Sequence, residues 1–130
     1  MKMEIKIKTI PHITQRYSTC GDYQEQPDGS WYISVSEMGD DRYNFLVAIH
    51  ELIELYLTQF KGITENEITA YDLYYEAKRE QGFVEEDSEP GFSTEAPYRK
   101  QHTIATAIEM MLAAELEVDW LAYDRKINSL

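Results

Sequence analysis

Three ionisable residues lie close together in a segment that is otherwise largely apolar, residues 42–60. His50, Glu51 and Glu54 are the groups between Tyr43 and Phe60 that can carry acid, base or metal chemistry near neutral pH. The segment contains no Gly or Pro, and its length predicts a helix of several turns. His50 and Glu54 then lie one turn apart on one face, with Glu51 beside them. Imidazole and carboxylate groups in this arrangement can bind zinc.

The order His50-Glu51-x-x-Glu54 resembles the H-E-x-x-H helix of the zincin metallopeptidases, with Glu in place of the second histidine. In zincins the two outer residues bind the metal and the Glu after the first ligand is the general base. The resemblance therefore implies that Glu51 is the catalytic residue. A carboxylate is an accepted zinc ligand, so Glu54 can serve as the second ligand. In the alternative interpretation, His50 and Glu54 form a hydrogen-bonded pair and Glu51 faces water.

A third metal ligand must come from elsewhere, and a helix expected from about residue 97 to residue 117 offers one. His102 and Glu109 lie on one stripe of this helix, among alanines that permit close packing. We expect His102 to be the third ligand and Glu109 to be an alternative ligand or the hydrogen-bond partner of one. Asp72, on a helix that starts near Thr64, is a further candidate for either role. In its alternative interpretation it is a carboxylate hydrogen-bonded to a tyrosine.

The segments that must position these residues begin with a small sheet. Residues 3–8 alternate apolar and charged side chains, which is typical of a strand with one buried face. The Pro-Asp-Gly-Ser turn at 27–30 separates a polar strand candidate, 22–26, from the strand W-Y-I-S-V-S at 31–36. We therefore expect an antiparallel sheet of about three strands at the N-terminus.

The helices follow the sheet. Asp40 or Asp41 can cap the first helix and Gly62 can end it. Thr64 and Glu67 form a capping box that starts the second helix. The long acidic segment 83–97 is interpreted either as a lid over the site or as a surface linker. The expected fold is one α+β domain over residues 1–130. Its small sheet precedes a zincin-like body of three to four helices, and the metal site lies between the first and third long helices.

Charge and composition limit the function. The chain of 130 residues has 24 acidic and 12 basic residues and a formal net charge of −12. This argues against nucleic acid as a partner, because phosphate binding needs a basic patch. The single cysteine, Cys20, excludes an intrachain disulfide and a multi-cysteine zinc cluster. No signal peptide or membrane-spanning run is seen, so we expect a soluble, cytoplasmic protein without a membrane partner.

Several motifs together resemble a group of uncharacterised phage and prophage proteins with a zincin-like helix. They are L-V-A-I-H-E-L-I-E-L, I-T-A-Y-D-L, and A-P-Y-R-K-Q-H followed by A-x-x-I-E and V-D-W, in that order along most of the chain. The resemblance implies a metal-binding domain with a peptidase function, but it does not imply a substrate. The zincin architecture also implies a strand beside the helix with a free edge for extended peptide, and 31–36 is the candidate.

The leading hypothesis is a zinc-dependent, metallopeptidase-like hydrolase that acts on a peptide or protein. His50, Glu54 and His102 would hold the metal, and Glu51 would transfer the proton. Iron or nickel would also suit these ligands. The alternatives are a non-catalytic phage-type metal-binding or protein-interaction module and a purely structural helical domain. An open coordination position facing a cleft would favour the enzyme.

Overall fold

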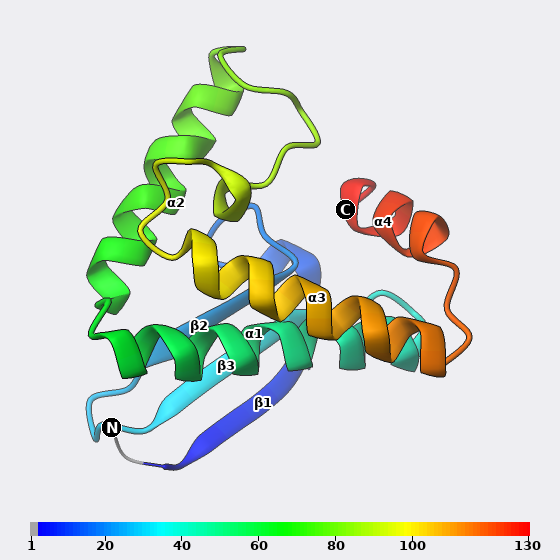
Figure 1. The fold of residues 1–130 in the computed structure, drawn as a ribbon, viewed down its shortest axis with the longest axis horizontal. Coiled ribbons are helices and arrows are strands. Elements are labelled where there is room, and N and C mark those ends of the chain that lie inside the picture. Colours follow the sequence, from blue (N-terminus) through cyan, green and yellow to red (C-terminus); the bar gives the residue numbers. More distant parts are fainter. Residues whose placement is uncertain (1–2) are drawn as a thin grey trace.

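The N-terminal part of the chain forms a three-stranded sheet (Figure 1). The computed structural model describes residues 3–130. Strands β1 (Ile5–Ile10), β2 (Gly21–Glu25) and β3 (Trp31–Ser36) are arranged in the order β1-β3-β2. The predicted β2–β3 hairpin is confirmed, because these two strands pair antiparallel across the turn at 27–30.

The sheet is mixed, which corrects the expectation that it is wholly antiparallel. β1 pairs parallel with β3, with Ile5 opposite Trp31. The reason is the segment 11–20, which crosses the face of β3 to reach the other edge of the sheet. Its short helix η1 (His12–Thr14) holds it there, since His12 Nδ1 lies 2.8 Å from Ser36 Oγ. β3 is therefore the central strand, and the prediction that it offers a free edge is wrong.

Helix α1 (Asp41–Lys61) lies against the sheet and begins and ends as the sequence predicts. The Asp40 side chain caps it by accepting a hydrogen bond from the backbone N–H of Arg42. Gly62 ends it with φ of 74°, a left-handed conformation that favours glycine. The side of α1 that carries His50 and Glu54 is buried.

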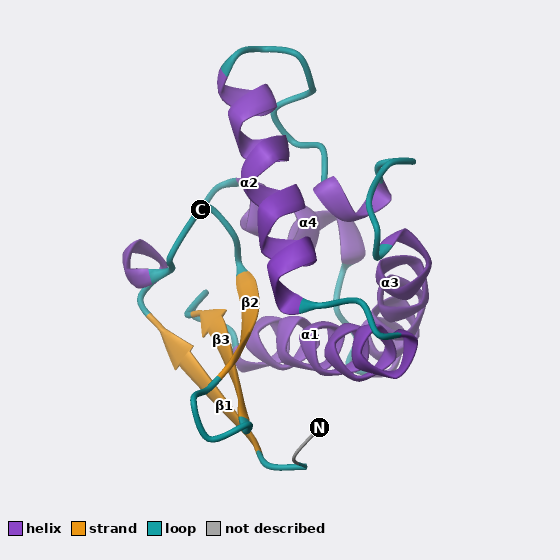
Figure 2. Ribbon diagram, turned by 90° about the vertical axis from the view of Figure 1, so that its left-hand side faces the viewer, coloured by secondary structure: helices purple, strands orange, loops and turns teal. Residues whose placement is uncertain are grey.

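The remaining helices build a second layer. Helix α2 (Glu65–Glu80) starts with the predicted capping box, and α3 (Arg99–Glu115) packs beside α1 (Figures 1 and 2). The short helix η2 (Pro90–Phe92) contacts both α2 and α3, and α4 (Trp120–Asn128) packs on α3. The predicted α+β class, a small sheet followed by a helical body, is confirmed. None of the helices in the described part of the chain is long and apolar enough to span a membrane.

The apolar core lies where the sheet, α1, α3 and α4 meet. Its largest fully buried side chains include Trp31, Ile33, Leu46, Leu55 and Tyr123. Polar residues are also buried at its border, and most of them come from α1, α2 and α3. This border is where the candidate site lies.

Candidate metal site

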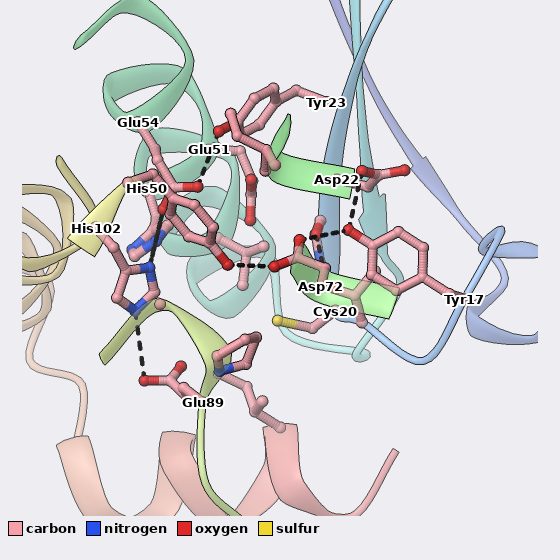
Figure 3. Close-up of a pocket in the computed structure, with 18 of the residues that line it drawn as sticks. Tyr17, Cys20, Asp22, Tyr23, His50, Glu51, Glu54, Asp72, Glu89 and His102 are labelled. Atoms are coloured by element: carbon pink, nitrogen blue, oxygen red, sulfur yellow. Dashed lines mark hydrogen bonds and ion pairs between the residues drawn. The ribbon is translucent and has the colours of Figure 1, made fainter. Parts of the chain in front are cut away.

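Three side chains from α1 and α3 converge in the interior, as the sequence predicts (Figure 3). His50 Nε2 and His102 Nδ1 lie 3.1 Å apart. Glu54 Oε2 lies 3.1 Å from the first nitrogen and 2.9 Å from the second. These separations are close to the roughly 3.3 Å between donors on a tetrahedral zinc ion with bonds of about 2.0–2.1 Å. The buried group could therefore hold a metal ion.

The outer nitrogen of each imidazole faces a carboxylate. His50 Nδ1 lies 2.7 Å from Glu109 Oε1, and the Tyr123 hydroxyl donates to Glu109 Oε2 at 2.6 Å. His102 Nε2 lies 3.6 Å from Glu89 Oε2. A carboxylate behind an imidazole fixes the ring and keeps a proton on the outer nitrogen, which leaves the inner nitrogen free to bind a metal. His50 has this arrangement, whereas the contact between Glu89 and His102, at 3.6 Å, is longer than a hydrogen bond.

The same carboxylates favour the protonated imidazoles. Burial acts to lower the pKa of His50, but Glu109 and Glu54 outweigh burial and raise this pKa well above its usual value. His102 behaves alike, since Glu54 and Glu89 outweigh its burial and raise its pKa to about 9. Burial acts to raise the pKa of Glu54, but hydrogen bonds from the two histidines lower it to about 2. A metal ion must therefore compete with protons for these ligands.

Glu51 faces the same pocket, a cavity of about 120 Å³ (Figure 3). A glycine on β2 makes room for it, because a Cβ at Gly21 would lie 2.6 Å from Glu51 Oε1. Burial raises the pKa of Glu51 well above its usual value, and the Glu54 charge adds to this effect. The alternative expectation, that Glu51 faces open water, therefore does not describe this side chain.

Asp72 lies on the opposite wall of the pocket, apart from the three candidate ligands (Figure 3). It accepts hydrogen bonds from the hydroxyls of Tyr17, at 3.0 Å, and Tyr98. Arg16 and Tyr17 both donate to Asp22 nearby. Asp72 thus has the tyrosine partners of the alternative interpretation, whereas Glu109 is the carboxylate that contacts a candidate ligand.

The segment 83–97 covers part of the pocket through η2. Gly91 lies against the His102 ring so closely that a Cβ there would lie 2.3 Å from the His102 Cγ atom. The Phe92 ring packs edge-on against the same imidazole, with ring centroids 4.6 Å apart. Of the two interpretations, lid or linker, this contact favours a cover over the site.

The remaining histidine and the cysteine do not join the triad. His12 contacts Ser36 on the face of the sheet. Cys20 lines the pocket. Burial raises the pKa of its thiol far above the usual value, and the Glu51 charge raises this pKa further. A neutral thiol is a poor nucleophile and a poor ligand.

Sequence reasoning missed several residues that complete the site. Glu89 and Gly91 are in an acidic loop that has no periodic pattern, so no sequence signal separates them from their neighbours. The Tyr123 hydroxyl donates to Glu109 from α4, a helix in which the sequence identifies no candidate for the site. Tyr23, from β2, donates to Glu54 Oε1 at 3.0 Å. The sequence identifies this segment only as a polar strand, so it does not predict that Tyr23 reaches the site.

Comparison of the chain with protein-family models, curated proteins and solved structures finds no match. The resemblance of its motifs to zincins and to phage proteins therefore stays a prediction. The geometry of the side chains alone carries the functional argument.

Proposed function

We propose that the protein is a zinc-dependent hydrolase that acts on peptide bonds, with His50, Glu54 and His102 as the metal ligands. One observation carries the proposal: the three donor atoms meet at the wall of a pocket that Glu51 also lines. Among the described His, Cys, Asp and Glu residues, the group that could hold the ion has three members. Three protein ligands with an open position are typical of catalytic zinc sites, whereas structural sites usually have four.

An ion held by these residues would supply a Lewis acid that polarises a carbonyl group and makes water more acidic. Glu51 would accept a proton from water in the pocket and give it to the amine that leaves. Its side chain lines the same pocket as the three ligands, which suits this role. Glu109 would hold His50 in the orientation needed for binding through Nε2.

The size of the pocket favours a second candidate function, a metal-binding module without turnover. A cavity of about 120 Å³ is small, since ligand sites usually have about 300–1,000 Å³. A substrate could place only a small group inside, such as a peptide carbonyl. The two candidates share the metal ligands and differ only in the role of Glu51.

Replacement of Glu51 distinguishes the two functions. The variant Glu51→Gln keeps the size of the side chain but cannot accept a proton at neutral pH. If Glu51 is the general base, the variant should retain zinc affinity and melting temperature. Its hydrolysis of labelled casein should fall by about a hundred- to ten-thousand-fold. Glu115→Gln, at an exposed carboxylate of α3, serves as the matched control. Full activity in Glu51→Gln would refute the base role, and zinc binding without hydrolysis by the natural chain would support the module.

A further inference from the structure

The side of α1 that faces away from the pocket is apolar and unusually exposed. Phe45, Tyr56 and Phe60 are 45%, 50% and 75% exposed, with the half-buried Ile49 and Ile53 between them. Counted from Phe45, the other four lie 4, 8, 11 and 15 residues along the chain, which places all five on one face of the helix. This face runs along α1 for about 22 Å, at 1.5 Å per residue.

Helix α3 carries a second exposed apolar stripe. It packs beside α1, and Ile104 and Met111 are 39% and 72% exposed, with the half-buried Ile108 between them (Figures 1 and 2). Helical geometry places these three on the side of α3 opposite to His102 and Glu109. We call the eight residues from the two helices the outer face; they are Phe45, Ile49, Ile53, Tyr56, Phe60, Ile104, Ile108 and Met111.

The α1 part of the outer face lacks the charge that covers the rest of the protein, whereas on α3 the exposed Lys100 and Glu115 flank the apolar stripe, four residues before Ile104 and four after Met111. The chain has 24 acidic residues. Between Arg42 and Phe60, however, the carboxylates are Glu51 and Glu54, and both belong to the opposite, pocket side of α1. Depletion of charge around aromatic residues and methionine is typical of the centre of a protein–protein interface. The chain has a net charge of −12, so charged residues are plentiful elsewhere on its surface. Their absence from this side of α1 favours contact with a protein over contact with water.

We propose that the outer face is the contact surface between two copies of this chain. Its five exposed side chains present on the order of 500 Å² of apolar surface, given about 150–250 Å² for a whole aromatic side chain. A standard interface buries about 800 Å² per partner, of which roughly 65% is apolar in homodimers. The apolar area available therefore matches what one copy contributes to such a dimer.

The charges at the ends of α1 fit a two-fold arrangement. Asp41 is in its first turn and Lys61 in its last. If the two copies of α1 pack antiparallel, each acidic end lies near the basic end of the other copy. The two helix dipoles then point in opposite directions and attract each other. Packing around a two-fold axis brings the same patch of both copies together and closes the assembly at two chains. The middle of α1, near Ile53, then lies next to its own copy.

Sedimentation equilibrium of the whole chain tests the proposal. At about 100 μM the natural chain should have twice the mass of one chain of 15.2 kDa. Tyr56→Glu places like charges near each other in the dimer and should raise the dissociation constant at least about 100-fold. Leu121→Glu on α4, at a residue that is 67% exposed but outside the outer face, should leave that constant unchanged. A natural chain that sediments as a monomer, or equal weakening by both variants, overturns the proposal.

Cross-linking gives a second test that does not depend on the folding of a charged variant. Ile53→Cys, at the middle of the face, should cross-link to its own copy with a short bis-maleimide. Phe45→Cys should not cross-link to itself but should cross-link to Phe60→Cys in a mixture, because antiparallel helices bring these ends together. Cys20 lies in the pocket, and the natural chain controls for its reaction. Cross-links of Phe45→Cys to itself, or none at Ile53→Cys, overturn the antiparallel dimer.

Discussion

The two walls of the pocket bury polar groups in opposite ways. On the wall made by Tyr17, Asp22, Asp72 and Tyr98, hydroxyl and guanidinium groups donate to the carboxylates. On the wall made by α1 and α3, two imidazole nitrogens and a carboxylate oxygen face one common point. Hydrogen bonds within the protein complete the first wall. On the second wall, the two imidazole nitrogens and the carboxylate oxygen are completed either by a bound cation or by protons between them.

This difference identifies which buried polar residues are structural and which are candidates for function. Buried carboxylates occur on both walls, so burial alone does not distinguish Asp72 from Glu54. The partners distinguish them, because both oxygens of Asp72 accept from tyrosine hydroxyls, whereas only one oxygen of Glu54 does, accepting from Tyr23. The other oxygen of Glu54 faces two imidazole nitrogens. Imidazole and carboxylate are both common zinc ligands, so this group is a candidate for function. Variants of one wall should therefore leave the properties of the other largely unchanged.

The largest expected effect is the loss of zinc from His102→Ala. Zinc in small domains binds with roughly 10–16 kcal/mol, so one of three ligands accounts for about 4 kcal/mol, a factor of about a thousand in affinity. Zinc should also raise the melting temperature of the natural chain and not that of the variant, since the ion links α1 to α3. Competition with a fluorescent chelator and thermal melts measure both effects. Asp72→Asn, on the opposite wall, is the control and should bind zinc normally.

The next effect belongs to the other wall and depends on pH. Burial raises the pKa of Asp72 to about 6 from an ordinary value of 3.8, although hydrogen bonds from Tyr98 and Tyr17 oppose this. The folded chain therefore holds this proton more tightly than the unfolded chain. The free energy of unfolding should fall as pH rises from about 4 to about 6, by about 3 kcal/mol in total from this group.

Asp72→Asn removes this dependence, because an amide does not titrate. Urea unfolding in the presence of a chelator, at several pH values, should show the variant gaining stability relative to the natural chain up to about pH 6. Above that pH the difference should be constant. The exposed Asp87→Asn provides the matched control. A difference between the natural chain and Asp72→Asn that does not change with pH would contradict the buried, titrating carboxylate.

Much of this arrangement follows from local sequence, and the rest depends on long-range contacts. The i, i+4 spacing of His50 and Glu54 and the stripe of His102 and Glu109 predict which side chains can meet. Caps and glycines predict where the helices begin and end. The parallel pairing of β1 could not be predicted, because alternation indicates a strand but not its neighbour. The expected buried face of this strand is also wrong, since Ile7 is 45% exposed and no residue of β1 is buried. Glu89 could not be identified either, since its role depends on how an irregular loop folds back over α3.

The next prediction compares two glycines that each leave space for one side chain of the site. A Cβ at Gly91 would lie 2.3 Å from the His102 ring, so Gly91→Ala must displace the imidazole or η2. We expect zinc affinity to fall about 10–100-fold, as when the support of a ligand is removed. A Cβ at Gly21 would instead meet Glu51 at 2.6 Å. Gly21→Ala should thus lower hydrolysis more than zinc affinity. Equal loss of zinc in both variants would show that the two glycines do not act on separate groups.

The smallest expected effect concerns Glu89. Among the described residues of the segment 83–97, it is the one carboxylate that lies behind an imidazole of the site. Its Oε2 lies 3.6 Å from His102 Nε2, an atom that is buried and has no hydrogen-bond partner in the described structure. A modest movement of η2 would turn this contact into a hydrogen bond and fix the ring with Nδ1 toward the other ligands. Glu89→Ala should therefore weaken zinc binding about 10-fold. Glu89→Gln should weaken it less, because the amide oxygen can still accept from Nε2–H.

The Glu89 side chain is 54% exposed, so neither change should alter the melting temperature of the chelator-treated protein. Glu86→Ala, in the same acidic segment, controls for the loss of negative charge, and an equal loss of affinity there would mean that charge alone, and not the orientation of His102, is responsible.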